Sequence, residues 1–207
     1  KNCCSKDCFE NDESYIFEPL SKEELDFLIQ EKQQIIYNPG ETIIKQNTSS
    51  TSVVCIKEGL AKVYVESGNH KNIVIKVVGK GDFITGGGLF NGNIQHFSIS
   101  ALTEVTCCFI NSAKITKIVS ENSEFAVKLL QNHIKQSNFL LEKLVNHTQK
   151  YMPGRVADTL LYLKNKTYKK NPFATTLTRQ DLAEMSNMTK ESFVRILQQF
   201  KESKLIS

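Results

Sequence analysis

Residues near the end of the chain have the types and spacing needed to read the edges of DNA bases. Lys190, Glu191 and Arg195 lie within one segment, and Ser192 and Gln199 belong to the same set. An arginine can donate two hydrogen bonds to guanine, and a glutamate can accept one from cytosine. Lysine, serine and glutamine can reach phosphates or base edges. This chemistry requires a helix that presents these side chains on one face.

The same segment has an apolar face that predicts such a helix. Its members recur at spacings of three, one and three residues: Phe193, Ile196, Leu197 and Phe200. Charged residues on a single short helix most often form a solvated face, so one helix does not decide the function. A second helix joined to it by a tight turn favours DNA binding.

Local signals predict that second helix and the turn. Thr178 and Asp181 have the spacing of a capping box, so a helix is expected to begin near Arg179. Asn187 tolerates a left-handed backbone and is expected to occupy the turn. Thr189 can then cap the helix that carries the base-reading side chains. The end of the chain is therefore predicted to be a helix-turn-helix.

The stretch Thr178-Arg-Gln-Asp-Leu, followed by Met188-Thr-Lys-Glu-Ser-Phe-Val-Arg-Ile-Leu, resembles the DNA-binding motif of the CRP/FNR transcription regulators. The resemblance implies that Glu191 and Arg195 read bases in half-sites with a TGA-like core. Asn187 stands where the family usually has glycine, a departure that the backbone tolerates. The resemblance also implies DNA contacts from the neighbouring residues, namely phosphate contacts from Thr178, Arg179 and Gln180, a base or phosphate contact from Lys190, and further contacts from Thr189 and Ser192.

The distribution of charge agrees with a DNA-binding end of the chain. Residues up to Gln149 carry 15 Lys and Arg against 17 Asp and Glu, whereas residues from Lys150 onward carry 11 against 5. A basic segment that coincides with the helix-turn-helix provides the attraction to phosphate that DNA binding requires. The chain has 207 residues, of which 40% are hydrophobic, and this is enough for two modest domains.

Other classes of function find less support in the sequence. No Ser-His-Asp, paired-carboxylate or phosphate-loop arrangement stands out, so an enzyme is not expected. The sequence contains no signal peptide and no run of about eighteen apolar residues, so we expect a cytoplasmic protein without a membrane partner. A ligand-binding module without DNA function is the remaining alternative. It predicts that Arg195→Ala leaves nucleic-acid binding unchanged.

Upstream, residues 34–110 contain short β-branched runs separated by turn residues. The runs cover residues 35–36, 42–44, 53–56, 61–65, 73–78, 97–101 and 105–110. Short strands at regular spacing with glycine turns indicate an antiparallel roll or barrel. Pro39-Gly-Glu, Cys55-Ile-Lys-Glu-Gly and Gly81-Asp-Phe-Ile resemble the cyclic-nucleotide-binding-like β-roll. The expected fold class is therefore α+β, with an N-terminal antiparallel β-roll, a long dimerisation helix and a C-terminal winged helix-turn-helix.

The expected pocket of this roll lacks the groups that bind cyclic nucleotides. Binders of cAMP carry a glutamate for the ribose and an Arg-Ser pair for the phosphate. Alignment on the Gly81 motif places Gly86 at the glutamate and Gln95-His96 at the Arg-Ser pair. We therefore do not expect cAMP to be the effector. The candidate effector pocket comprises Gly86, Gly87, Gly88, Gln95 and His96.

Two features of this pocket leave alternatives open. The glycine triplet either presents backbone N–H groups to an anion or is a loop packed closely against another strand. His96 either binds a ligand or haem iron, or is an exposed or hydrogen-bonded side chain.

Six cysteines offer a second candidate for the sensed signal: Cys3, Cys4, Cys8, Cys55, Cys107 and Cys108. Disulfides are not expected in the cytoplasm, so the clustering suggests metal binding, redox chemistry or no function. Regulators of the FNR type hold an iron–sulfur cluster, and the resemblance implies the ligands Cys3, Cys4, Cys8 and Cys108, although the N-terminal spacing departs from the family pattern. Adjacent residues of a strand face opposite ways, so at most one of Cys107 and Cys108 is a ligand. The alternative is unreactive buried thiols at Cys55 and Cys107.

Residues 122–151 are expected to form one long helix with a heptad seam. Asn122 or Ser123 can cap it. The seam residues alternate in steps of three and four: Val127, Leu130, Ile134, Ser137, Leu141, Leu144, Thr148 and Tyr151. Such a seam favours a coiled-coil homodimer, which is also the family's arrangement, and the alternative is a helix buried in a single-chain core. Pro153 and Gly154 are expected to end the helix and to form a hinge.

These predictions divide the chain into four parts. They are a cysteine-containing segment (1–18), the β-roll sensor (19–121), the dimerisation helix (122–151) and the helix-turn-helix domain (152–207), with the family's wing expected to be missing after Ser207. The expected function is a homodimeric transcription regulator that binds palindromic double-stranded DNA and contacts RNA polymerase. A signal at the roll would shift the dimer helices and the hinge. This would change the separation of two recognition helices, which a palindrome sets at roughly 34 Å.

Overall fold

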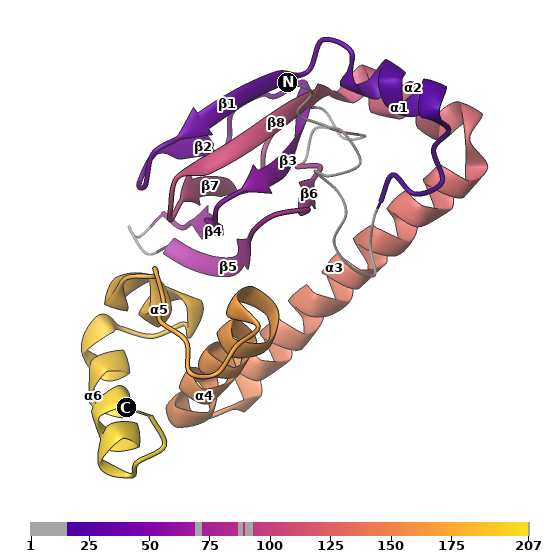
Figure 1. Ribbon diagram of the computed structural model, residues 1–207. Coiled ribbons are helices and arrows are strands. Elements are labelled where there is room, and N and C mark those ends of the chain that lie inside the picture. Colours follow the sequence, from indigo (N-terminus) through magenta and orange to yellow (C-terminus); the bar gives the residue numbers. More distant parts are fainter. Residues whose placement is uncertain (1–15, 69–71, 87–88, 90–92, 207) are drawn as a thin grey trace. The chain divides into compact units, whose positions relative to one another are not determined.

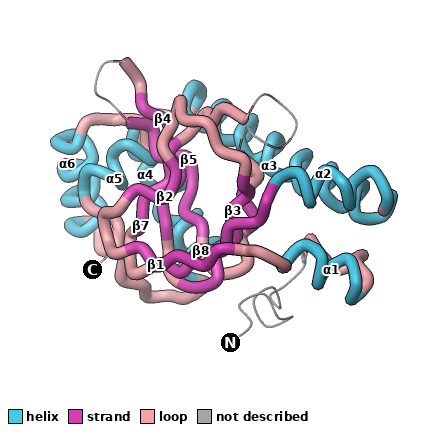
Figure 2. Tube along the Cα trace, turned by 90° about the horizontal axis from the view of Figure 1, so that it is seen from above, coloured by secondary structure: helices cyan, strands magenta, loops and turns pink. Residues whose placement is uncertain are grey.

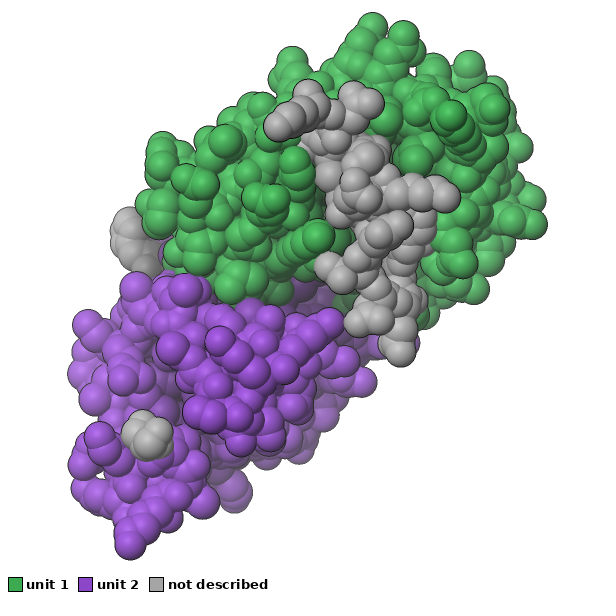
Figure 3. Space-filling model, in the orientation of Figure 1, with its two compact units in different colours: residues 1–63, 77–137 green, residues 64–76, 138–207 purple. Residues whose placement is uncertain are grey.

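The protein has an α+β fold whose elements are labelled in Figure 1. The computed structural model describes residues 16–68, 72–86, 89 and 93–206. The chain separates into two compact units, coloured in Figure 3: residues 1–63 with 77–137, and residues 64–76 with 138–207.

The described strands form two four-stranded sheets, seen from above in Figure 2. One sheet has the order β1-β8-β3-β6 and the other the order β2-β7-β4-β5. β8 pairs antiparallel with both β1 and β3, and β2 pairs antiparallel with β7. The predicted roll is therefore confirmed, and β6 is a strand that the sequence analysis missed. The strands are β1 (Gln33–Tyr37), β2 (Thr42–Ile44), β3 (Ser52–Glu58), β4 (Ala61–Glu66), β5 (Asn72–Val78), β6 (Phe83–Ile84), β7 (Ser98–Ala101) and β8 (Val105–Asn111).

Side chains of β3 and β8 point alternately into two apolar clusters. Val54 and Ile56 belong to a cluster built from both sheets, which is the interior of the roll. Cys55 instead joins a second cluster that contains residues of three helices. Cys107 and Cys108 divide between the two clusters in the same way, as the period of two along a strand requires. The prediction that these two cysteines face opposite ways is confirmed.

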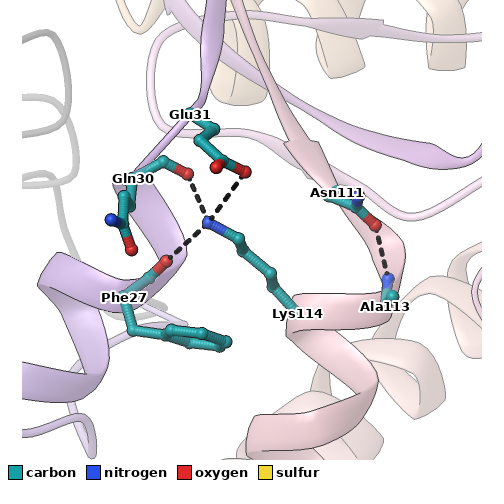
Figure 4. Close-up of polar contacts among 6 residues, drawn as sticks. All are labelled: Phe27, Gln30, Glu31, Asn111, Ala113 and Lys114. Atoms are coloured by element: carbon teal, nitrogen blue, oxygen red, sulfur yellow. Dashed lines mark hydrogen bonds and ion pairs between the residues drawn. The ribbon is translucent and has the colours of Figure 1, made fainter.

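Two short helices, α1 (Lys22–Ile29) and α2 (Ser112–Glu121), pack together beside the roll. A lysine joins them, as Figure 4 shows: Lys114 Nζ donates to the backbone carbonyls of Phe27 (3.1 Å) and Gln30, and it lies 3.7 Å from the Glu31 carboxylate. The carbonyls at the end of α1 have no partner within the helix, so this lysine satisfies them. Asn111 caps α2 by accepting from the N–H of Ala113 at 2.9 Å.

The long helix α3 (Ser123–Gln149) begins as predicted, because the Asn122 side chain accepts from the N–H of Phe125. The predicted role of Pro153 and Gly154 as the end of this helix is wrong. Both residues lie in the first turn of α4 (Met152–Tyr162), where proline is tolerated because its missing N–H has no partner there.

Three further helical elements of the second unit follow α4 among the described residues. A π-helical turn, η2 (Leu163–Tyr168), extends α4, and α5 (Arg179–Met185) and α6 (Lys190–Glu202) form the end of the described chain. None of the helices in the described ranges is long and apolar enough to span a membrane.

Candidate nucleic-acid interface

The local geometry of the helix-turn-helix is as the sequence predicted. The Thr178 hydroxyl accepts from the N–H of Asp181 at 3.1 Å, and the Asp181 carboxylate accepts from the N–H of Thr178 at 2.9 Å, which completes the capping box of α5. Asn187 occupies the turn with φ of 51°, in the left-handed region. The Thr189 hydroxyl accepts from the N–H of Ser192 and caps α6.

The inner face of α6 anchors it against α5. Phe193, Ile196 and Leu197 are buried, whereas Phe200, predicted to belong to the same face, is half-buried. The facing residues of α5 are also buried, and Ala183 is completely so. The small alanine side chain allows a close approach of the two helices. This packing fixes α6 on one side and leaves its other side to solvent.

The predicted DNA-binding residues gather at the starts of the two helices. Lys190, Glu191 and Arg195 are exposed on α6, and Ser192 is half-buried beside them. The first turn of α5 presents the second group, which is exposed together with the cap of α6: Thr178, Arg179, Gln180 and Thr189. Because the N-terminal residues of a recognition helix reach base edges, this arrangement suits insertion of α6 into a major groove.

The pocket predicted in the roll contains a buried polar side chain. Gln95 is completely buried, and neither its Oε1 nor its Nε2 has a hydrogen-bond partner. Its amide lies against Gly86, where an added Cβ would be 2.0 Å from Gln95 Oε1. Gly86 also has φ of 57°, so two independent constraints favour glycine there. The structure thus brings Gly86 and Gln95 together; His96 is exposed, and Gly87 and Gly88 lie outside the described residues.

The cysteines of the described ranges are all withdrawn from solvent. Cys108 lies opposite Cys55 in the β3–β8 ladder, and both are at most 2% exposed. Burial raises the pKa of the Cys107 thiol to about 12, so it stays protonated at neutral pH. Within the described part of the chain no group of three or more potential ligands could hold a metal ion. Cys3, Cys4 and Cys8 lie outside the described residues.

The predicted seam of α3 is exposed in the single chain. Five apolar seam residues have exposed fractions between 51% and 60%: Val127, Leu130, Ile134, Leu141 and Leu144. Such a contiguous apolar stripe is unusual on a surface that faces only water. Phe125 and Leu129, on the other side of the helix, are buried in the cluster shared with the roll and the short helices.

Sequence reasoning missed the polar residues on the opposite side of the end of α3. Lys143 Nζ donates to the carbonyls of Val74 (3.0 Å) and Ile75 (2.8 Å), and burial lowers the pKa of its ammonium to about 8. Burial, together with the charge of Lys143, lowers the pKa of His147, which forms a hydrogen bond with the backbone of Met185. Neither residue belongs to a motif, so the sequence gives no signal for these contacts.

Comparisons with known proteins agree with this fold and site. The model of the cyclic nucleotide-binding domain matches residues 34–122, and the model of the Crp-like helix-turn-helix domain matches residues 154–207. The cAMP-activated global transcriptional regulator CRP of Salmonella typhimurium is 26% identical over 180 residues, which cover 83% of each chain.

Solved structures show the same fold. FixK2 from Bradyrhizobium japonicum matches with a TM-score of 0.77 and 17% identity, over 85% of this chain and 87% of that one. The c-di-GMP responsive global regulator CLP of Xanthomonas campestris matches with a TM-score of 0.76 and 16% identity, over 90% of this chain and 95% of that one.

A roll of the cyclic nucleotide-binding type and a Crp-like helix-turn-helix in one chain define a DNA-binding transcription regulator. The chain belongs to the CRP/FNR family of transcription regulators.

Proposed function

We propose that the protein is a homodimer that reads a palindromic DNA site through α6, under the control of a signal at the roll other than cAMP. Glu191 and Arg195 read base edges, and Lys190 and Ser192 contact bases or phosphates beside them. Thr178, Arg179, Gln180 and Thr189 contact the phosphate backbone and fix the register. By analogy with its relatives, the bound dimer contacts RNA polymerase.

The observation that carries this proposal is the exposed polar start of α6 on a firmly packed helix. Glu191 and Arg195 are four residues apart and exposed, while Phe193 between them is completely buried. A rigid element is required for base reading because a misplaced side chain loses its paired hydrogen bonds.

A selection from random duplexes tests the reading of DNA. The unaltered protein should enrich an inverted repeat with TGA-like cores whose half-site centres lie about one helical turn, roughly 10–10.5 base pairs, apart. Enrichment of no sequence above the starting pool would contradict the proposal.

The exposed seam of α3 supports the homodimer. Pairing of two such stripes would remove several half-exposed leucine and isoleucine side chains from water, at about 25 cal/mol per Å². Light scattering should give about twice the 23.4 kDa mass of one chain. Leu141→Glu should give a monomer because it places a carboxylate in the seam, whereas Glu142→Gln, at an exposed neighbouring position, should leave the dimer intact.

The pocket of the roll supports a signal other than cAMP. Residues 1–154 contain no arginine, so this chain offers no guanidinium fork for a cyclic phosphate in its roll. The residue aligned with the family's arginine is Gln95, whose neutral amide is buried against Gly86. A neutral amide has no charge to pair with a phosphate, so this position suits a ligand without a phosphate.

An iron–sulfur cluster held by Cys3, Cys4, Cys8 and Cys108 is the second candidate for the signal. Burial of Cys108 among apolar neighbours favours a packed thiol over a cluster ligand. Ultraviolet-visible absorption and iron analysis of anaerobically purified protein distinguish an iron–sulfur cluster from a packed thiol. A colourless, iron-free protein that still binds its selected duplex excludes the cluster.

A further inference from the structure

Three side chains from outside the helix-turn-helix hold three consecutive residues of its turn. Arg155 Nη1, at the start of α4, donates to the backbone carbonyl of Asn187 at 3.0 Å. The Thr159 hydroxyl, one turn further along α4, hydrogen-bonds to the hydroxyl of Ser186 at 2.8 Å. His147, near the end of α3, forms a hydrogen bond with the backbone of Met185. We call Met185, Ser186 and Asn187 the reading turn, and the other three residues its clamp.

The reading turn sets the angle between α5 and α6. Asn187 has φ of 51°, and the backbone N–H of Met188 donates to the carbonyl of Ala183 at 3.0 Å, which closes the end of α5. Asparagine adopts this left-handed conformation more readily than other non-glycine residues, and it marks the point where the chain turns. A bond to the carbonyl of Asn187 therefore acts on the residue where the chain changes direction toward α6.

The hydroxyl pair formed by Thr159 and Ser186 is withdrawn from water. Ser186 is completely buried and Thr159 is 5% exposed, so neither hydroxyl can exchange its partner for solvent. Arg155 is half-buried and its Nε is withdrawn from solvent without a hydrogen-bond partner, whereas the bond from its Nη1 reaches Asn187, an exposed residue. A hydrogen bond from a charged donor is stronger than one between neutral groups, so the guanidinium favours this contact.

We propose that Arg155 and Thr159 are positioning residues for DNA reading, which fix the orientation of the recognition helix through the reading turn without touching DNA. This inference rests on the proposed reading of bases by α6.

The test compares specific with non-specific DNA binding. The specific probe is the duplex enriched by the unaltered protein from a random pool, and the non-specific probe is a random-sequence duplex of the same length. Arg155→Met should weaken specific binding by roughly tenfold or more, because a base-reading helix at the wrong angle loses paired contacts. Binding to the random duplex should change by less than about threefold.

A matched control removes the same charge nearby. Lys150→Met removes the ion pair of Lys150 with Asp158 of α4, whose N–O distance is 2.7 Å. This ion pair does not involve the reading turn. This variant should keep the preference for the selected duplex. Arg155→Lys should recover most of the preference, since an ammonium can still donate to the carbonyl of Asn187.

A second variant addresses the buried hydroxyl pair. Thr159→Val keeps the shape of the side chain but leaves the Ser186 hydroxyl without this partner, so specific binding should fall by roughly tenfold, and Thr159→Ser should restore it. Thermal unfolding of each variant is recorded in parallel.

The outcomes separate the inference from the proposed function. Equal losses on the two probes, losses that follow the amount of folded protein, or an unchanged preference in Arg155→Met overturn the positioning role. If the unaltered protein itself prefers no duplex, the proposed function fails instead.

Discussion

Buried polar side chains near the helix-turn-helix and in the roll differ in whether they have hydrogen-bond partners. Around the helix-turn-helix, Asp181, Thr159 and Ser186 are buried and each has a hydrogen-bond partner. The buried Nε of Arg155 lacks one, but its guanidinium still donates from Nη1 to Asn187. In the roll, Gln95 is completely buried, and both polar atoms of its side chain lack a hydrogen-bond partner. The backbone of Gln95 is nevertheless held, by bonds with Asn47 and Thr48.

The difference indicates which polar groups serve structure and which serve function. A partnered buried group fixes geometry, whereas an unpartnered one costs about 1–3 kcal/mol and persists where another role requires it. The polar side chains named around the helix-turn-helix thus each keep at least one hydrogen bond. In the roll, the unpartnered amide of Gln95 lies at the position aligned with the family's ligand-binding arginine.

The largest expected effect concerns Lys143, a half-buried cation that donates to two backbone carbonyls. Burial lowers its pKa from 10.5 in the unfolded chain to about 8 in the folded one, so the unfolded chain binds the proton more tightly. The free energy of unfolding should therefore rise between pH 8 and 10.5, by up to about 3 kcal/mol. Urea unfolding across this range measures it, and Lys143→Met should flatten the rise. An identical pH dependence in both proteins would refute the assignment.

A smaller loss is expected at Asp181, which accepts from both the N–H and the hydroxyl of Thr178. Asp181→Ala should lower the free energy of unfolding by about 2 kcal/mol, because it removes the carboxylate half of the capping box and leaves the N–H and the hydroxyl of Thr178 without that acceptor. Chemical denaturation measures the change. Glu184→Ala, on the same helix but half-buried, serves as the control and should cost less than about 1 kcal/mol. Equal losses of unfolding free energy in Asp181→Ala and Glu184→Ala would mean that the capping box does not stabilise the protein.

At Gln95, a substitution is expected to stabilise the protein rather than destabilise it. Gln95→Met keeps the length of the side chain and removes its unpartnered polar atoms, so the free energy of unfolding should rise by about 1 kcal/mol. The same denaturation experiment measures it. A clear loss of stability would show that the amide has a structural partner and would remove the contrast between the two regions.

The smallest expected effect is that of cAMP. Because residues 1–154 contain no arginine, millimolar cAMP should leave the melting temperature and the affinity for the selected duplex unchanged. Differential scanning fluorimetry and an equilibrium DNA-binding assay measure both. A stabilisation of several degrees would show that the roll binds the cyclic phosphate by other groups.

The helix-turn-helix was predictable because its signals are local. Thr178 with Asp181, Asn187 and Thr189 act within one turn of their own positions, and each does in the structure what its residue type favours. The β-roll was predictable for a similar reason. Successive side chains of β3 and β8 alternate between the two apolar clusters, and this alternation is local to each strand.

Features that depend on distant parts of the chain were not predictable. The contacts of Lys143 with Val74 and Ile75 and of Arg155 with Asn187 join residues far apart in sequence. Pro153 was misread because the same residue ends one helix and begins another, and only the position of the following helix decides which. The burial of Gln95 follows from the approach of Gly86, which no local pattern records.

The central claim is that Arg195, on the exposed side of α6, reads a base. The most direct measurement is the affinity of the unaltered protein and of Arg195→Ala for the selected duplex and for its single-base variants, with Lys201→Ala as a control for charge. The account predicts that Arg195→Ala loses about 1–3 kcal/mol of specific binding and stops discriminating at one base pair, while Lys201→Ala still discriminates. Unchanged discrimination by Arg195→Ala at every base pair would contradict it.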